Sequence, residues 1–375
     1  MAGIYLHIPF CRQACNYCNF HFSTSLGLKE DMLAAIRTEA ALQQHYLEAA
    51  PIRTVYFGGG TPSLLSVTEL MRLWDTLEKH FPDQQLEEVT LEANPDDLSP
   101  AYLKELRQTP VSRLSIGIQS FQDNDLRYMN RAHNAGQAAY AVKAAQDAGF
   151  EEISIDLIYG TPTMSDKEWQ HNIDQALSLQ VPHISCYALT VEARTALAHA
   201  IAKGRSRQPE EGQTAAQFGQ LMTRLREGGF DHYEISNFAR PGHYARHSTN
   251  YWKGIPYLGL GPSAHSFNIR SRQWNVAHNA AYIKSLLTEN KVPYEREELS
   301  AEDRHNEYLM TALRTMWGAD LEHVEKAFGA GSRKRLEQES ARYLERGWME
   351  LQQGHLVLST SGKLLADRIA SELFI

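Results

Sequence analysis

Residues 10–20 read FCRQACNYCNF and contain three of the chain's four cysteines. Cys11, Cys15 and Cys18 have the spacing Cys-x3-Cys-x2-Cys and directly follow a short apolar run at residues 4–8. A structural zinc site and most iron–sulfur clusters take four protein ligands. The three thiolates therefore predict either a fourth ligand from another residue or a coordination position left open for a second molecule.

Two kinds of metal site fit this spacing. His21 would complete a Cys3His zinc set, and structural zinc sites of that composition are common. The alternative is a 4Fe-4S cluster held by three cysteines, with one iron free to take a substrate or cofactor. The sequence also predicts a glycine-rich loop and polar side chains in the same pocket. A structural zinc site needs neither of these features, so they argue against zinc.

Short β-rich runs alternate with segments that carry apolar residues at helical spacing. The runs lie at residues 4–8, 54–58, 88–93, 113–118, 153–160 and 183–189. The helical segments between them include residues 28–47, 67–80, 136–148 and 167–179. This order predicts repeated βα units and therefore an α/β fold with a parallel sheet.

Glycine-rich or polar residues stand at the ends of several expected strands. The second strand ends in GGGTP at residues 58–62, the third in Glu92-Ala-Asn-Pro95 and the fourth in Gln119, while Asp156 lies within the fifth. Ligands of parallel α/β folds bind at the carboxyl ends of the strands. These residues predict one shared pocket, and they favour a partial (β/α) barrel of the TIM type over a doubly wound sheet.

The composition of the chain changes after Ile283, where a stretch rich in charged residues leads into a segment expected to be helical. We expect residues 1–285 to form the barrel core and its extension, 286–300 a linker, and 301–375 a C-terminal domain. Ser300 and Asp303 have the spacing of a capping pair at the start of a helix. Residues 347–360 predict two short strands joined by a Gln-Gly turn, followed by a helix at 362–374. The C-terminal domain is therefore expected to be winged-helix-like.

Composition places the chain among ordinary globular proteins, with 43% hydrophobic and 22% charged residues. Its net charge of -8 argues against broad nucleic-acid binding.

No apolar stretch is long enough to span a membrane and the N-terminal residues lack a basic leader, so we expect a cytoplasmic protein. In that reducing compartment the clustered cysteines are expected to be metal ligands or redox groups. Cys186, within an apolar strand, is expected to be a core residue.

The loop CxxxCxxC at residues 11–18 resembles that of the radical SAM superfamily. In that family three cysteines hold a 4Fe-4S cluster whose open iron binds the amino and carboxylate groups of S-adenosylmethionine. One electron from the cluster then cleaves the sulfonium to give a 5'-deoxyadenosyl radical. The resemblance thus implies a 4Fe-4S cluster and S-adenosylmethionine as cofactors. It implies adenosylmethionine contacts from Tyr5, Tyr17, Gly59, Gly60, Thr61, Glu92, Gln119, Arg131 and Asp156.

Further motifs narrow the resemblance to one group of tetrapyrrole proteins. They are YLHIPFC at residues 5–11, GGGTPS at 58–63, GIQSFQD at 117–123, MNRAH at 129–133, SIDLIYGTP at 154–162 and GLGPSAHS at 259–266. This group includes oxygen-independent coproporphyrinogen III dehydrogenase and the haem chaperone HemW. The sequence HNEY at 305–308 resembles the HNxxY motif of the HemW branch, which implies haem binding by His305, Asn306 and Tyr308.

Two features favour the HemW branch over the dehydrogenase. The dehydrogenase has a further cysteine two residues after the last cluster ligand, where this chain has Phe20, and it carries an N-terminal extension, whereas the first strand here begins near Ile4. The resemblance then implies a haem chaperone whose partners are haem and apo-haemoproteins of the respiratory chain. It leaves open a homodimer, recruitment to the membrane by partners, and as alternatives the dehydrogenase or another radical tetrapyrrole enzyme.

Overall fold

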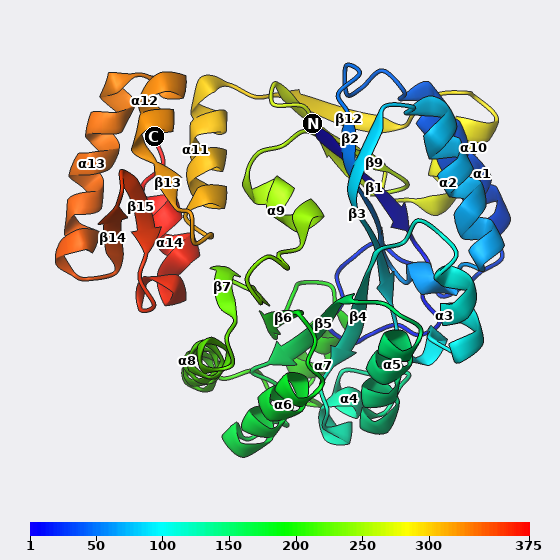
Figure 1. The fold of residues 1–375 in the computed structure, drawn as a ribbon, viewed down its shortest axis with the longest axis horizontal. Helices are drawn as coiled ribbons and strands as arrows, with labels where there is room; N and C mark the ends of the chain where they lie inside the picture. The colour runs from blue at the N-terminus through cyan, green and yellow to red at the C-terminus, as the bar shows by residue number, and fades with distance from the viewer.

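The computed structural model describes residues 1–375, and its largest element is a 12-stranded sheet that stays open at both edges. The strand order is β12-β11-β10-β9-β1-β2-β3-β4-β5-β6-β8-β7. Its central strands, all parallel, are β1 (Ala2–Ile8), β2 (Ile52–Gly59), β3 (Gln84–Ala93), β4 (Arg113–Gln119), β5 (Glu152–Tyr159) and β6 (His183–Ala188). The α/β partial barrel expected from the sequence is confirmed, and its strands curve around a concave face (Figure 1).

Helices follow most of the parallel strands and cover the convex face of the sheet (Figure 1). These helices are α1 (Lys29–Leu42), α2 (Val67–His80), α3 (Pro100–Leu106), α5 (Ala135–Asp147), α6 (Asp166–Ser178) and α8 (Glu211–Glu227). The short helices α4 (Asp123–Tyr128) and α7 (Ala196–Ala202) instead contribute Leu126 and Leu197 to a small separate cluster beside the cysteine loop. Capping boxes at Ser66, Asn134 and Ser165 begin α2, α5 and α6, because each side chain accepts a hydrogen bond from a backbone N–H of the first turn.

The sheet continues beyond the parallel strands at both edges. β7 (Asp231–Glu234) and β8 (Asn237–Ala239) extend one edge, while β9 (Tyr257–Leu260), β10 (His265–Phe267), β11 (Ser271–Asn275) and β12 (Tyr294–Glu298) extend the other. Helix α9 (Arg246–Trp252) lies on the concave side, and α10 (Asn279–Leu287) packs against α1 on the convex side. Strand β12 lies in the range expected as a linker, where it pairs antiparallel with β11.

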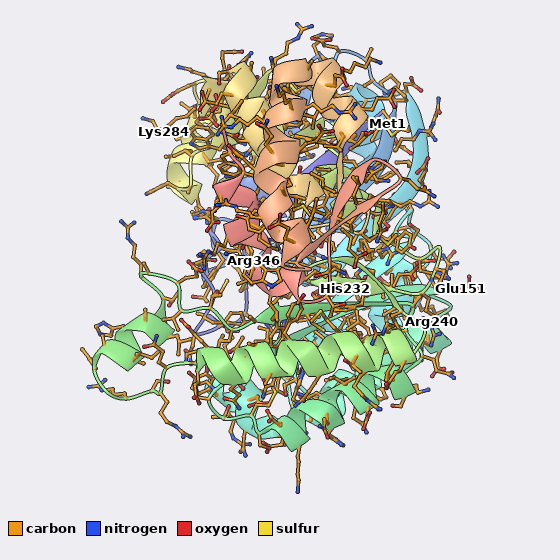
Figure 2. The ribbon with its side chains drawn as sticks, turned by 90° about the vertical axis from the view of Figure 1, so that its left-hand side faces the viewer. Met1, Glu151, His232, Arg240, Lys284 and Arg346 are labelled. Carbon is orange, nitrogen blue, oxygen red and sulfur yellow. The ribbon has the colours of Figure 1, made fainter.

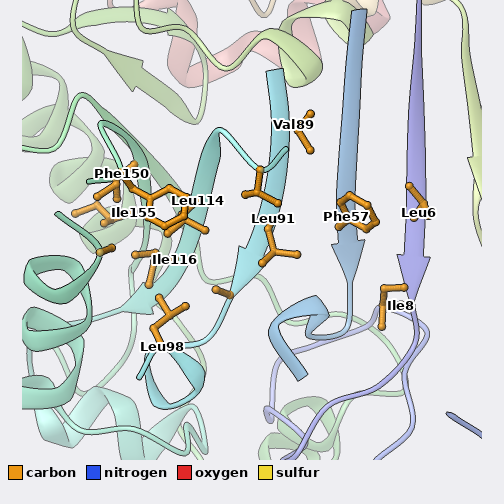
Figure 3. Packing of buried hydrophobic residues seen from close by; sticks show 14 of the residues in the cluster. Leu6, Ile8, Phe57, Val89, Leu91, Leu98, Leu114, Ile116, Phe150 and Ile155 are labelled. Carbon is orange, nitrogen blue, oxygen red and sulfur yellow. The ribbon is translucent and has the colours of Figure 1, made fainter. Parts of the chain in front are cut away.

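The core lies between the strands and the helices of the convex face. Leu6, Phe57, Leu91, Leu114 and Ile155 come from neighbouring strands and are at most 1% exposed, and Figure 3 shows their side chains in one layer. Burying a side chain of this size stabilises the fold by roughly 1.5–3 kcal/mol. Because this layer fixes the strands, the loops at their carboxyl ends start from defined positions.

Residues after β12 form a second unit with its own core of 15 buried residues. It begins with the capping box of Ser300 and Asp303, as the sequence predicts. Its helices are α11 (Ala301–Ala312), α12 (Leu321–Phe328), α13 (Ala330–Glu345) and α14 (Ala366–Glu372). A small antiparallel sheet joins β13 (Ala319–Asp320), β14 (Met349–Gln352) and β15 (His355–Leu358), so the expected hairpin is present and gains a third strand.

Polar contacts join this C-terminal domain to the barrel. Arg314 pairs with Glu234 of β7 at 3.1 Å and also with Asp367, while Lys363 Nζ donates to the carbonyl of His232 at 3.2 Å. Figure 2 looks onto this side, where α8 runs across the barrel below the C-terminal helices and strands. None of the helices has the length and apolar character needed to cross a membrane.

Candidate functional site

The three clustered cysteines lie in a loop at the carboxyl end of β1. A backbone bridge between Phe10 and Ser23 closes this loop, and Cys11 N donates to the carbonyl of Ser23 at 3.0 Å. The thiols of Cys11, Cys15 and Cys18 line one cavity of about 420 Å³, together with residues from the carboxyl ends of β2 to β6. The chain thus gathers its cysteines where parallel α/β folds bind ligands.

Two side chains from the barrel point their hydrogen-bond donors at the sulfurs. The hydroxyl of Thr61 donates to Cys11 Sγ at 3.4 Å, and Arg131 Nη1 donates to Cys15 Sγ at 3.3 Å. Burial raises the pKa of Cys11 to about 11. Hydrogen bonds to cysteine sulfur stabilise the negative charge of iron-bound thiolates and tune the cluster potential. The donor set therefore fits a 4Fe-4S cluster held by Cys11, Cys15 and Cys18.

The Cys3His zinc alternative does not fit the geometry. His21 Nε2 lies 2.7 Å from Asn279 Oδ1, and His21 is not part of the cysteine cavity. No group of three or more His, Cys, Asp or Glu side chains is close enough to hold a single metal ion. The three cysteines line one cavity, but their sulfurs do not converge on the position of a single ion. This arrangement suits a multi-iron cluster better than one zinc ion.

The glycine run after β2 is packed against the cysteine loop. A Cβ on Gly60 would lie 2.6 Å from the carbonyl oxygen of Phe10, and Gly59 adopts φ 111° with its Cβ position 2.8 Å from His7 Nδ1. Side chains do not tolerate such contacts, and positive φ favours glycine. The resemblance implies adenosylmethionine contacts from Gly59 and Gly60, and the structure adds a second reason for these glycines, namely close packing beside Cys11.

Hydrogen bonds from β2 hold the carboxylate of Glu92 in the cavity. The hydroxyl of Tyr56 donates to Glu92 Oε1 at 2.7 Å, and the N–H of Gly59 donates to Oε2 at 3.1 Å. Burial, opposed by these hydrogen bonds and assisted by the charge of Asp156, raises the pKa of Glu92 to about 7. Burial likewise raises the pKa of Asp156 to about 6. A cationic ligand group would favour the ionised carboxylates.

Arg131 connects the cysteine loop to β3 and β4. Its Nη2 donates to Asn94 Oδ1 at 2.7 Å and to the carbonyl of Gly117 at 2.8 Å. Gln119, at the end of β4, has φ 67°, a conformation that residues other than glycine seldom adopt. Such strain is found at ligand sites, where the surrounding structure enforces it.

All the residues expected at the adenosylmethionine site except Tyr5 line this cavity. Tyr5 lies behind Gly58, and its hydroxyl is 3.1 Å from His7 Nδ1. The cavity also includes Asn94, Ser115 and Tyr187, which the sequence reasoning did not select. Asn94 stands in the quoted Glu92-to-Pro95 segment, and the other two alternate with core residues on β4 and β6, so position along the strand was the available signal.

The raised pKa of Glu92 predicts a pH-dependent stability. The unfolded carboxyl has a pKa near 4.5 and the folded one about 7. Its contribution to the free energy of unfolding is therefore fully present below about pH 4.5 and is lost as the pH rises to about 7, by at most about 3 kcal/mol. In urea unfolding without adenosylmethionine, Glu92→Gln should remove this part of the pH dependence. Glu105→Gln, on the exposed side of α3, serves as control, and equal pH profiles for parent and Glu92→Gln would contradict the prediction.

A second, larger cavity of about 1110 Å³ lies between the concave face and the C-terminal domain. Its walls come from the inner strands, from α9, and from α11 and α12. Glu92, Ser115, Asp156 and Tyr187 line both this cavity and the one at the cysteines. A molecule in the large cavity would therefore border the cofactor cavity through shared side chains.

Of the three residues expected to bind haem, Tyr308 lines the large cavity, whereas His305 and Asn306 do not. His305 is 1% exposed, its Nδ1 is 3.3 Å from Asn306 Oδ1, and its buried Nε2 has no hydrogen-bond partner. The side chain of Asn306 bonds the backbone N–H and carbonyl of Ile375. Tyr308 lines the large cavity, and its hydroxyl accepts a hydrogen bond from Asp320 N at 2.7 Å.

Phe20, which replaces the extra cysteine of the dehydrogenase, is 69% exposed at the rim of the cysteine cavity. An exposed phenyl ring at this position can contact a ligand, but it can neither bind iron nor transfer a proton.

Comparison with known proteins agrees with this geometry. Residues 5–176 match the radical SAM superfamily, and residues 299–365 match the HemN C-terminal domain. Heme chaperone HemW from Mycobacterium tuberculosis is 37% identical over 99% of this chain and 94% of its own length. Heme chaperone HemW from Bacillus subtilis is 33% identical over 98% of both chains.

A solved structure supports the fold over the full length. Coproporphyrinogen III oxidase HemN from Escherichia coli, a radical SAM enzyme, aligns with a TM-score of 0.84 at 20% identity and covers all of this chain and 90% of its own. At that identity the alignment shows the shared architecture alone. With the cysteine loop, the barrel and the sequence relatives taken together, the chain belongs to the HemW family of the radical SAM superfamily.

Proposed function

We propose that this protein is a haem chaperone that holds haem in the large cavity and passes it to apo-haemoproteins. The observation that carries the proposal is the position of the HNEY motif, because Tyr308 forms part of the wall of the 1110 Å³ cavity. That volume is at the upper end of ordinary ligand pockets, so it has room for a planar tetrapyrrole. Family membership supplies the cargo, since the relatives are named heme chaperones.

The cavity offers side chains that suit an amphipathic ring with carboxylate groups. Tyr257, Phe267 and Trp317 supply aromatic surface, while Arg272 and Arg304 supply positive charge. We further propose His305 as an iron ligand. Burial lowers the pKa of His305, which favours the neutral imidazole that binds iron, and its Nε2 has no partner within the chain. Asn306 beside it orients the ring through Nδ1.

The cofactor site is proposed to regulate haem binding. Cys11, Cys15 and Cys18 would hold the cluster, and Glu92, Arg131 and Asp156 would bind and orient adenosylmethionine. When bound, these groups supply one-electron cleavage of a sulfonium. Because the two cavities share side chains such as Glu92 and Tyr187, adenosylmethionine is expected to favour one conformation of the haem cavity over another.

The side chains that line both cavities also support a second candidate function, that of a radical enzyme acting on a tetrapyrrole. A propionate side chain in the large cavity would border the residues that orient adenosylmethionine. For coproporphyrinogen III, incubation of the reconstituted protein with adenosylmethionine and dithionite would then yield protoporphyrinogen and 5'-deoxyadenosine. We expect neither product, because Phe20 stands where the dehydrogenase has a cysteine. Decarboxylated product would overturn the chaperone proposal.

The chaperone proposal is tested by haem titration of the reconstituted protein under anaerobic conditions, followed by transfer to apo-myoglobin. We expect one haem per chain, transfer that depends on adenosylmethionine, and weaker binding by about tenfold or more in His305→Ala. His199→Ala, on the exposed side of α7, is the control and should bind as the parent does. Absence of stoichiometric haem binding in the parent would refute the proposal.

The recipients we propose are apo-haemoproteins of the respiratory chain, with the chaperone in the cytoplasm and recruited to the membrane by these partners. A homodimer is proposed as the working unit. Light scattering tests the dimer, and fractionation of cells with and without the recipients tests recruitment. Equal membrane content in both cell types would contradict recruitment by partners.

A further inference from the structure

The wall that the C-terminal domain presents to the large cavity contains two histidines outside the HNEY motif, His323 on α12 and His355 on β15. His323, on α12, lines the cavity, whereas His305 does not. The ring of His305 instead packs edge-on against Phe328, with 5.0 Å between centroids, and Phe328 does line the cavity. In this conformation His305 would reach a ligand in the cavity only after Phe328 turns aside.

Hydrogen bonds fix the position of His323 at the start of its helix. The side chain of Asp320 caps α12 and accepts from the backbone N–H groups of Glu322 and His323, at 2.9 and 3.3 Å. The backbone N–H of Asp320 in turn donates to the hydroxyl of Tyr308. The imidazole of His323 takes no part in these bonds, and the residue is exposed to the cavity.

Tyr308 of the motif thus holds the turn that carries His323. The two rings lie 4.6 Å apart between centroids, at an interplanar angle of 40°. This contact limits the rotation of the imidazole, and the hydrogen bond to Asp320 limits movement of the backbone. A prepositioned imidazole with free ring nitrogens is suited to bind a metal centre, because little conformational entropy is lost on binding.

Positive side chains lie on the same cavity. Arg304 stands four residues before Tyr308 on α11, so the two residues share a helix face. Arg272 of β11 lines the cavity from the barrel side, and its Nη2 is 2.8 Å from Glu307 Oε1. Haem carries two propionates, and guanidinium groups bind carboxylates with suitable geometry.

We propose that His323 is an iron ligand of haem in the large cavity and that Arg304 binds a propionate of the same haem. This inference rests on the proposed haem-binding function. It gives the motif residue Tyr308 a positioning role, and it assigns the iron to His323 because His323 is the cavity histidine whose ring Tyr308 contacts. His305 then ligates only from a conformation in which Phe328 has moved.

The test uses the reconstituted full chain titrated with ferric haem, with binding and the absorption and electron paramagnetic resonance spectra as readouts. In His323→Ala we expect an altered spectrum with loss of an imidazole ligand, affinity weaker by about tenfold or more, and recovery of the parent spectrum with added imidazole. Tyr308→Phe should weaken binding less and leave the type of ligand unchanged. Arg304→Gln should lower affinity without altering the spectrum.

The exposed His199→Ala variant is the matched control, and His305→Ala separates the two imidazoles. A parent spectrum retained in His323→Ala, with the change seen in His305→Ala alone, overturns this inference and leaves the haem-binding function intact. A parent that binds no haem overturns the proposed function and this inference together. Loss of the spectrum in His323→Ala with rescue by imidazole supports it, because a merely structural defect would not respond to imidazole.

Discussion

Replacing Cys15 by alanine should abolish the iron–sulfur cluster. In the proposed site its side chain supplies one of three thiolates, so Cys11 and Cys18 alone would remain as ligands. The change also leaves Arg131 Nη1 without its sulfur acceptor. After anaerobic reconstitution we expect iron and sulfide contents near zero and no visible absorption from the cluster. Haem binding should persist, since the proposed iron ligands lie on the C-terminal domain and not in the cysteine loop.

Cys186→Ala is the matched control for this experiment. Cys186 is 1% exposed in the core of β6, and burial raises the pKa of its thiol well above the ordinary value. Removing this sulfur should cost about 1 kcal/mol of stability and leave the iron content unchanged. Full iron content in Cys15→Ala, or loss of iron in Cys186→Ala, would show that the ligands have been assigned wrongly.

Replacing Gly60 by alanine should displace the cysteine loop and empty most of the cluster site. The added Cβ would lie 2.6 Å from the oxygen, and 2.9 Å from the carbonyl carbon and the nitrogen, of Phe10. These are backbone atoms next to Cys11, so no side-chain rotation relieves the contact. Forced packing of this kind costs roughly 1–3 kcal/mol. We expect a large loss of iron content and a lower free energy of unfolding in urea.

Gly219→Ala, within α8, provides the control. A Cβ there meets nothing within 4 Å, so the substitution should stabilise the helix by roughly 0.5–1 kcal/mol and leave the cluster intact. The two variants add the same methyl group and differ in what it meets. Equal iron contents in both would mean that the close approach of Gly60 to Phe10 is unimportant for the cluster.

Much of the barrel was predictable because its signals are local. The β-rich runs at residues 4–8 and 54–58 fall within β1 and β2, and the helical pattern at 67–80 coincides with α2. Ser300 and Asp303 form the expected capping box. Strand β12 was not predicted, because its residues are all exposed and, apart from Tyr294, charged, and its partner β11 lies on another segment.

Residue order alone predicts the chemistry of the cysteine loop and its place after a strand, because ligand type and spacing are properties of neighbouring residues. Tertiary structure decided which distant groups meet. It aimed Arg131 at Cys15, packed Gly60 against Phe10, and turned His21 toward Asn279. It also buried His305 and left His323 facing the cavity, since the packing of α11 against α12 fixes which face of each helix is covered. Such contacts depend on the packing of whole elements, which residue spacing along one helix does not encode.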